Sequence, residues 1–368
     1  MTDTERTTGT SDGDLLLEVD DVVKHFPVRS NTLLNRTSAQ VRAVDGVSFS
    51  LKVSETLGLV GESGCGKSTL ARLVTALHPV TSGHIRFKGQ DVTTLSRRQM
   101  RPLRRSVQMV FQDPYGSLNP RRRVGSILAD PFLVHDSLSR SEVKKQVQAL
   151  MARVGLSPEH YNRFPSEFSG GQRQRIGIAR ALALRPDLIV CDEPVSALDV
   201  SIQAQIINLL EDLQDEFMLT YIFIAHDLSV VRHVSDRIAV MYLGKLVETG
   251  PVEEIYSASR HPYTASLLSA VPVAATAFHG PRKKRIILTG DVPSPVRPPS
   301  GCRFHPRCPK AQAKCAVEEP VLEQKPGDTP GHLTACHFPV TADEPLAAAS
   351  REEPPAAAQP TLAEGAQR

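Results

Sequence analysis

The sequence has no long apolar run, no leader peptide and almost no net charge, and each absence excludes a class of protein. No window reaches the ~18 continuous apolar residues that a membrane-spanning helix needs. Residues 1–14 lack the basic and apolar regions of a secretory signal, which predicts a chain that stays in the cytoplasm. The 43 Lys and Arg nearly balance the 40 Asp and Glu, leaving +3. We therefore expect no nucleic-acid partner.

Cysteine is scarce and unevenly placed. Only Cys65 and Cys191 lie in the first two-thirds of the chain, and the other four of the six cysteines lie between residues 302 and 336. In a reducing compartment, such a cluster favours metal binding over disulfides. The sequence also shows no internal repeat, so each motif described below occurs once.

What is present predicts roughly two domains, at about 150 residues per domain. From residue 15 to about 255, short aliphatic runs alternate with longer segments, the pattern of an α/β domain with a mainly parallel sheet. Within it, residues 101–180 or thereabouts have helical character and several Pro breaks, which predicts a helical insertion. Residues 256–340 predict a small C-terminal domain that holds the cysteine cluster. The polar residues 1–14 and the Ala- and Pro-rich residues 341–368 predict disorder.

Three short apolar runs, at residues 56–60, 188–191 and 221–225, are each followed at once by polar residues. Such runs are typical of buried central strands. Parallel strands present functional groups at their C-terminal ends, so we expect the site at that edge of the sheet.

The first of these strands leads into a match to G-x-x-x-x-G-K-[ST], which precedes a helical pattern from Thr69. The glycines let the backbone wrap a phosphate, Lys67 reaches the β and γ phosphates, and Ser68 can ligate Mg²⁺. A glycine turn with a chance lysine is the plainer alternative. The predicted ATP-binding residues here are Gly61, Glu62, Ser63, Gly64, Cys65, Gly66, Lys67, Ser68 and Thr69.

The second strand ends in an acid pair, Asp192 and Glu193. Asp192 would hold Mg²⁺, directly or through water, and Glu193 would orient and deprotonate the attacking water. Alone, an acid pair at a strand end could equally be a cap or a solvated turn.

The surrounding motifs decide between these readings. Residues 168–174, FSGGQRQ, lie upstream of the acid pair, and residues 196–199, SALD, lie downstream. Here the chain closely resembles the ATP-binding subunits of ABC transporters. The resemblance implies an ABC-type phosphate-loop ATPase fold and assigns a signature motif that acts in trans on ATP held by a second subunit. The signature residues are Ser169, Gly170, Gly171 and Gln172.

The same resemblance assigns four further positions. Gln112 resembles the residue that links Mg²⁺ and the attacking water to the transmembrane partner. His226 resembles the switch histidine at the γ-phosphate, although alone it reads as an ordinary core histidine. Asp199 resembles the acid that lies across the dimer interface. Phe26 is the candidate for the aromatic that stacks on adenine, with a plain core aromatic as the alternative.

Three segments resemble more specifically the ATPase subunits of dipeptide and oligopeptide importers. They are residues 111–121 (FQDPYGSLNPR), 261–264 (HPYT) and 301–309 (GCRFHPRCP). The resemblance implies a peripheral subunit on the cytoplasmic face of the membrane. The partners it implies are a second ATPase subunit, identical or paralogous, two permease subunits and an extracytoplasmic peptide-binding protein. Importers of nickel and of some sugars use similar subunits, so the solute rests on analogy.

The late cysteines have the spacing Cys302-x5-Cys308-x6-Cys315-x20-Cys336. Four thiolates match an iron–sulfur cluster, a structural zinc or reduced thiols. The short spacing of paired zinc ligands is absent, and similar importer ATPases carry a [4Fe-4S] cluster here, so we expect that cluster. Histidines 305, 332 and 337 could substitute as ligands but read as loop residues.

Two rival classes remain. A soluble ABC ATPase acting on ribosomes or DNA would have two cassettes or long coiled-coil insertions, and this chain shows neither. A nucleotide-binding iron–sulfur redox protein would not need the complete hydrolysis set. The basic run at residues 282–285 could touch lipid or nucleic acid but is more typical of a solvated turn.

Overall fold

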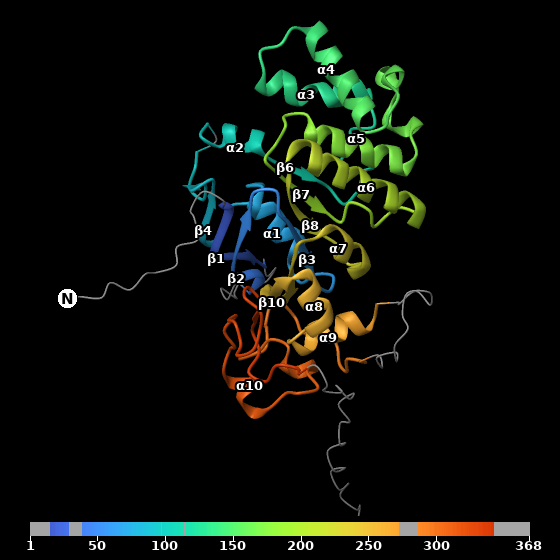
Figure 1. The fold of residues 1–368 in the computed structure, drawn as a ribbon. Coiled ribbons are helices and arrows are strands. Elements are labelled where there is room, and N and C mark those ends of the chain that lie inside the picture. The colour runs from blue at the N-terminus through green and yellow to red at the C-terminus, as the bar shows by residue number, and fades with distance from the viewer. Residues whose placement is uncertain (1–14, 29–38, 97, 114, 272–285, 342–368) are drawn as a thin grey trace, which may run out of the picture.

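The computed structural model describes residues 15–28, 39–96, 98–113, 115–271 and 286–341. Two sheets form the centre, a helical lobe lies at one end, and the C-terminal segment lies at the other (Figure 1). The predictions for residues 1–14, for nearly all of 341–368 and for the basic run at 282–285 lie outside the described residues. No helix in the described part of the chain is both long and apolar enough to span a membrane.

The larger sheet has seven strands in the order β11-β10-β9-β3-β8-β7-β6. Strands β6, β7, β8, β3 and β9 run parallel, whereas β10 and β11 pair antiparallel at one edge. Their bounds are β3 Thr56–Val60, β6 Val107–Val110, β7 Leu188–Asp192, β8 Thr220–Ile224, β9 Arg237–Tyr242, β10 Lys245–Pro251 and β11 Leu333–Thr334.

Every residue of β3, β7 and β8 is buried. Continuous apolar runs form such strands because helices cover both faces of a parallel sheet. The three strands predicted from sequence agree with the observed ones within one residue at each end. Their C-terminal ends meet at one edge, where the polar residues of the three motifs follow.

The smaller sheet is antiparallel, in the order β2-β1-β4-β5, and sequence reasoning did not separate it from the larger one. Its long strands show irregular burial and register shifts, so a strict two-residue alternation is missing from the sequence. The strands are β1 Leu15–Pro27, β2 Gln40–Lys52, β4 Ser82–Phe87 and β5 Gln90–Asp91.

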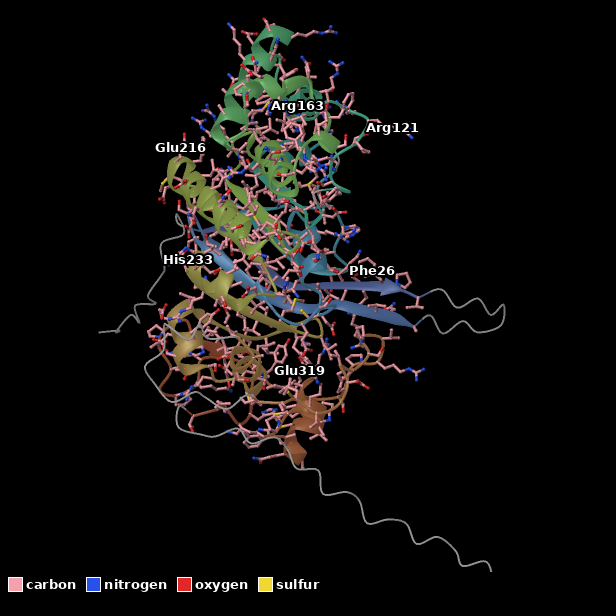
Figure 2. All side chains as sticks on the ribbon, turned by 90° about the vertical axis from the view of Figure 1, so that its right-hand side faces the viewer. Phe26, Arg121, Arg163, Glu216, His233 and Glu319 are labelled. Carbon is pink, nitrogen blue, oxygen red and sulfur yellow. The ribbon has the colours of Figure 1, made fainter. Side chains whose placement is uncertain are left out.

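Six helices lie around the two sheets: α1 Lys67–Val74, α2 Met100–Ser106, α6 Val200–Phe217, α7 Leu228–Val234, α8 Val252–Ala258 and α9 Pro262–Ser269. Helix α1 follows β3 and contacts β7 and β8, so its first turn lies at the strand ends. Figure 2 shows Phe26 at the tip of β1 on one side of the molecule and Glu216, near the end of α6, on the opposite side.

The helical lobe contains α3 Val124–His135, α4 Arg140–Arg153 and α5 Gly170–Leu182, with 3₁₀ turns η1 Pro158–Asn162 and η2 Pro165–Glu167. The predicted insertion at 101–180 therefore starts too early, because residues 107–110 form β6 of the large sheet. This run, VQMV, is too short to show its strand character beside the basic helix α2. Both α4 and α5 begin with capping boxes, which satisfy the free N–H groups of their first turns.

The C-terminal segment, residues 286–341, does not support the predicted separate domain. It supplies β11, which pairs with β10 at the edge of the large sheet. The fully buried carboxylate of Glu248 on β10 accepts hydrogen bonds from the backbone N–H groups of Arg260 and His261 and pairs with His332 of the segment at 2.8 Å. The segment, which also contains η3 His305–Arg307 and α10 Ala313–Val317, is thus built into the cassette.

Candidate functional site

The loop between β3 and α1 is shaped by two glycines at which a side chain would meet the backbone of a neighbouring strand. Gly66 has φ 114°, and a Cβ built on it would lie 2.1 Å from the Ala43 carbonyl oxygen. Gly61 has φ 151°, and its Cβ would lie 2.2 Å from the Met241 carbonyl oxygen. The loop therefore packs directly on the backbones of β2 and β9. Its N–H groups and the first turn of α1 can surround an anion.

Lys67 and Ser68 are the first two residues of α1 and have different partners. Lys67 is 5% exposed, and its Nζ donates to the carbonyl oxygens of Gly61 at 2.7 Å and Glu62 at 3.1 Å. Ser68 Oγ donates to Asp192 Oδ1 at 2.9 Å. The ammonium group of Lys67 is suited to bind phosphate, and the neighbouring hydroxyl–carboxylate pair is suited to bind Mg²⁺.

Asp192 ends β7 and is buried, and burial raises its pKa even though the hydrogen bond from Ser68 opposes that shift. A buried carboxylate is stabilised in its charged form by a cation. The hydroxyl of Ser68 and the oxygen of Asp192 are hard oxygen ligands of the kind that Mg²⁺ takes. These residues fit the predicted magnesium site.

Glu193, Gln112 and His226 come together although they lie far apart in the chain. Gln112 Nε2, after β6, donates to Glu193 Oε2 at 2.8 Å, and His226 Nδ1, after β8, lies 3.5 Å from the same oxygen. Glu193, directly after β7, adopts a positive φ of 46°, a conformation uncommon for a residue other than glycine. The carboxylate lines a cleft that also includes His226 and Gln203. This geometry can orient a water molecule and accept its proton.

The signature residues lie apart from this cluster. Ser169 caps α5, its Oγ accepts from Gln172 N–H, and both side chains are exposed. Gly171 is buried, and a Cβ there would lie 2.5 Å from Ile202 of α6. In the described part of the chain, no hydrogen bond or ion pair joins this motif to residues 61–68. Asp199, at the N-terminus of α6, is also exposed.

Phe26 lies near the end of β1, half buried. Its ring meets the edge of His78 at 5.8 Å between centroids, and Lys24 Nζ lies 5.1 Å from the ring centroid. The ring thus has an exposed portion at the rim of the small sheet. Its stacking on adenine stays a prediction.

Sequence reasoning missed the residues that join the C-terminal segment to the phosphate loop. Arg307 donates to both carboxylate oxygens of Glu62, at 2.8 and 3.1 Å, and the Tyr263 hydroxyl accepts from the Glu62 N–H at 2.8 Å. Tyr263 and Arg307 lie in segments, 261–264 and 301–309, that the sequence marks only by their resemblance to peptide importer subunits. Nothing in a single sequence pairs residue 62 with residue 307.

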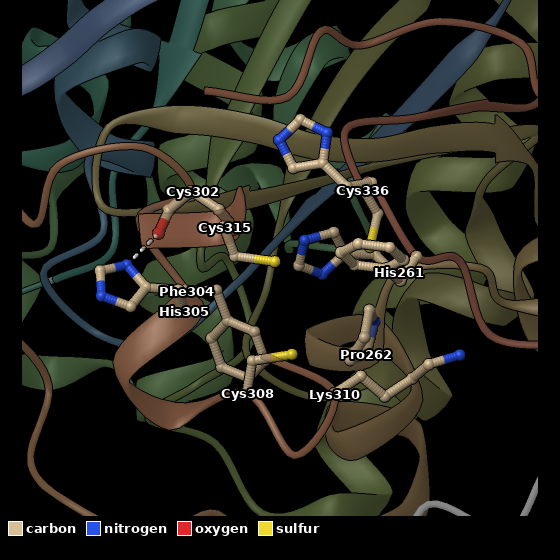
Figure 3. A pocket seen from close by; sticks show the side chains of 11 residues that line it. His261, Pro262, Cys302, Phe304, His305, Cys308, Lys310, Cys315 and Cys336 are labelled. Atoms are coloured by element: carbon tan, nitrogen blue, oxygen red, sulfur yellow. Dashed lines mark hydrogen bonds between the residues drawn. The ribbon is translucent and has the colours of Figure 1, made fainter. Parts of the chain in front are cut away.

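The four late cysteines line one pocket, with Phe304 among its other walls (Figure 3). All are free thiols, and burial raises the pKa of Cys308 to about 12 and of Cys336 to about 11. Among the described residues, no group of three or more His, Cys, Asp or Glu is arranged to hold a single metal ion. The expected metal centre is therefore not shown.

The three histidines near these cysteines already have hydrogen-bond partners. His305 Nδ1 lies 2.9 Å from the Cys302 carbonyl oxygen, His332 is paired with Glu248, and His337 Nε2 lies 3.0 Å from the Glu318 carbonyl oxygen. Each ring is oriented by these contacts, which favours the reading of these histidines as structural residues.

Two parts of the chain match models of known protein families. Residues 44–196 match the family model described as "ABC transporter". Residues 247–315 match the model described as "Oligopeptide/dipeptide transporter, C-terminal region". The matched range includes Tyr263 and Arg307.

Similar curated proteins cover 83% to 88% of this chain. The oligopeptide transport ATP-binding protein AppF of Bacillus subtilis is 56% identical over 88% of this chain and 97% of its own. The di/tripeptide transport ATP-binding protein DppF of Pseudomonas aeruginosa is 53% identical over 83% and 94%. The oligopeptide transport ATP-binding protein OppF of Escherichia coli is 52% identical over 84% and 93%.

Solved structures share the cassette fold. The ATP-binding cassette MJ0796, in a dimeric post-hydrolysis state with ADP and Pi, has a TM-score of 0.58 at 26% identity, covering 64% of this chain and 99% of its own. The cbiO1 protein of Clostridium perfringens, part of the ABC transporter complex cbiONQ, has a TM-score of 0.57 at 27% identity, covering 67% and 92%. The chain belongs to the ABC transporter family, among the ATP-binding proteins of oligopeptide and dipeptide transporters.

Proposed function

We propose that this chain hydrolyses ATP to energise the import of dipeptides or oligopeptides across the cytoplasmic membrane. The observation that carries the proposal is that Lys67, Ser68, Asp192 and Glu193 lie together at the ends of β3 and β7. The chain also matches peptide transport ATP-binding proteins over most of their length. A site of this kind suits phosphoryl transfer to water.

The residues have separate roles. Lys67 binds the β and γ phosphates, and Ser68, Asp192 and Gln112 serve Mg²⁺, which neutralises phosphate charge when bound. Glu193 takes the proton of the attacking water, and Gln112 and His226 orient its carboxylate through the contacts at 2.8 and 3.5 Å. Phe26 stacks on adenine.

The chain acts with partners. Its one phosphate loop and one signature motif are not joined within the described part, and Ser169, Gln172 and Asp199 are exposed. We infer that they face ATP held by a second ATPase subunit, with Gly170 and Gly171 allowing close approach. Two permease subunits would hold the pair at the cytoplasmic face, and an extracytoplasmic binding protein would deliver the peptide.

The first prediction concerns transport. Deleting the subunit is expected to abolish ATP-driven uptake of short peptides and to confer resistance to toxic peptide analogues. Uptake of labelled di- and tripeptides is measured in the deletion strain, with the intact gene and a Lys67→Ala gene returned in parallel. Only the intact gene should restore uptake. Normal peptide uptake with impaired nickel or sugar uptake would assign another solute, and normal uptake of all three would favour a role outside transport.

We also propose that Cys302, Cys308, Cys315 and Cys336 hold a [4Fe-4S] cluster. The spacing of the four cysteines disfavours a structural zinc, because the short separation of paired zinc ligands is absent from it. A cluster places one cysteine on each of four irons, so its ligands stand further apart around one pocket. The raised pKa values of Cys308 and Cys336 mean that these two thiols stay protonated when free, and iron would replace their protons.

The second prediction is that Cys308→Ser lowers the iron content of anaerobically purified protein from about four per chain and weakens its brown colour. His337→Gln is the matched control, because it alters the same pocket without removing a thiol, and should keep the iron. Limited proteolysis should show residues 290–340 loosened in Cys308→Ser alone. Stoichiometric zinc, or no metal in the unaltered protein, would contradict the cluster.

A further inference from the structure

The phosphate loop is held from outside by two residues far along the chain. Arg307 forms a two-pronged pair with the Glu62 carboxylate, and Arg307 Nη1 also lies 3.4 Å from the Tyr242 hydroxyl. The Tyr263 hydroxyl accepts from the Glu62 N–H. Glu62 is thus fixed through both its backbone and its side chain, directly after Gly61 at the start of the loop.

Tyr263 is placed by the residues just before it. His261 Nδ1 accepts from the Tyr263 N–H at 3.1 Å and so caps α9, and Pro262 occupies the first helical position. His261 is itself buried, and burial lowers its pKa to about 3, which keeps its ring neutral and able to accept. The His-Pro-Tyr sequence therefore serves to aim one hydroxyl at the phosphate loop.

Arg307 is placed by the cysteine-rich turn. It ends η3, between Cys302 and Cys308, and the ring of Phe304 from the same turn packs against Tyr242 and Tyr263 with centroids 5.3 Å from each. Phe304 and both tyrosines are almost fully buried. The aromatic cluster thus forms a rigid connection between the turn that carries Arg307 and the tyrosine that holds Glu62.

The same turn has a second attachment to the nucleotide-binding face. Arg303 pairs with Asp45 of β2 and donates to the Leu243 carbonyl oxygen, and Asp45 also contacts His25 at 2.8 Å. The following residue along β9–β10, Gly244, donates its N–H to the Cys65 carbonyl oxygen of the phosphate loop at 2.8 Å. Arg307 therefore holds the loop directly through Glu62, whereas Arg303 holds the residue next to Gly244, which contacts Cys65.

We propose that Arg307 and Tyr263 are positioning residues of the nucleotide site, which hold the phosphate loop through Glu62 and make its affinity for ATP depend on the cysteine-rich turn. The inference rests on the proposed role of the loop in binding phosphate. The side chains of Arg307 and Glu62 are 9% and 26% exposed, so water screens their charge-assisted pair only in part. A loop fixed before nucleotide arrives loses less freedom on binding.

The effect should be on binding more than on chemistry, because neither residue touches the cluster around Glu193. Arg307→Ala and Glu62→Ala should each raise the Kd for ATP about tenfold, and the double variant should raise it about tenfold as well instead of a hundredfold. Arg307→Lys keeps the charge but loses the fork and should recover part of the affinity. Tyr263→Phe keeps the aromatic packing and should weaken ATP through loss of the hydroxyl alone.

The experiment measures Kd with a fluorescent ATP analogue in the full chain, and KM and kcat in the assembled transporter. Lys245→Ala is the matched control, since the Lys245 side chain pairs with Glu319 and fastens the same segment without a hydrogen bond or ion pair to residues 61–68 in the described part of the chain. It should leave Kd unchanged. Equal weakening by Lys245→Ala, additive effects of Arg307→Ala and Glu62→Ala, or unchanged Kd in both Arg307→Lys and Tyr263→Phe would overturn the proposal.

Lys67→Ala separates this outcome from a failure of the proposed function. If Lys67→Ala abolishes ATP binding while the Arg307 and Tyr263 variants bind normally, the loop binds ATP and the positioning role is wrong. If Lys67→Ala binds ATP normally, the assignment of the loop itself is wrong, and the positioning role is overturned with it.

Discussion

Replacing Glu193 by Gln is expected to lower kcat for ATP hydrolysis by about 10²–10⁴-fold while ATP binding persists. The amide keeps the length of the side chain and can still accept the hydrogen bond that Gln112 donates at 2.8 Å, but it cannot take a proton. Hydrolysis is measured by phosphate release from the assembled transporter, and binding by the Kd for ATP.

Glu211→Gln on α6 is the matched control for this change. Glu211 lies 3.5 Å from His233 as a second Glu–His pair, away from the strand ends, so its loss should leave kcat within about twofold. Near-normal turnover in Glu193→Gln would remove the general-base assignment. A large loss of ATP affinity in Glu193→Gln would instead indicate a role in holding nucleotide.

Gly66→Ala is expected to weaken ATP binding by about 100-fold, because two free-energy penalties destabilise the binding conformation of the phosphate loop. Alanine at a positive φ costs about 1–2 kcal/mol. The new Cβ would also lie 2.1 Å from the Ala43 carbonyl oxygen, so β2 or the loop must shift, and such overpacking costs about 1–3 kcal/mol. A shift of the loop would distort the shape that surrounds phosphate.

Gly89→Ala controls for the backbone cost alone, because Gly89 has φ 75° with no atom within 4 Å of the added Cβ, in the turn between β4 and β5. It should lower thermal stability slightly and leave Kd unchanged. Thermal unfolding of Gly66→Ala shows whether the fold survives. ATP affinity equal to that of the unaltered chain, in folded Gly66→Ala, would show that the loop does not need this contact.

The common location of the candidate chemical residues could be predicted because each belongs to a motif at the end of a buried strand. Lys67, Asp192 and His226 belong to motifs at the C-terminal ends of β3, β7 and β8, and parallel strands bring these ends together. The hydrogen bond between Gln112 and Glu193 follows from the neighbouring positions of β6 and β7. A local motif is therefore enough to predict where a residue lies when the strand order brings the motifs to one edge of the sheet.

The attachment of the C-terminal segment could not be predicted in this way. The pairing of Arg307 with Glu62 spans 245 residues, and β11 has two residues, too few for any periodic pattern. The role of Tyr263 depends on where α9 lies against the loop, which the helix itself does not encode. The separate C-terminal domain was expected because the cysteine-rich sequence differs in composition from the cassette, although the two share a sheet.

The late position of β11 and Arg307 has a consequence for synthesis on the ribosome. Domains generally fold as units as the chain emerges, N-terminal parts first. Here the edge strand of the large sheet is formed by residues 333–334, which are synthesised late. The contact between His332 and Glu248 can form only at the same late stage. The phosphate loop is synthesised early, whereas Arg307, which holds it through Glu62, is synthesised only late in translation. A ribosome that stalls before residue 307 therefore leaves a nascent cassette with its loop unsupported and β10 without its neighbour, a form that chaperones would need to protect.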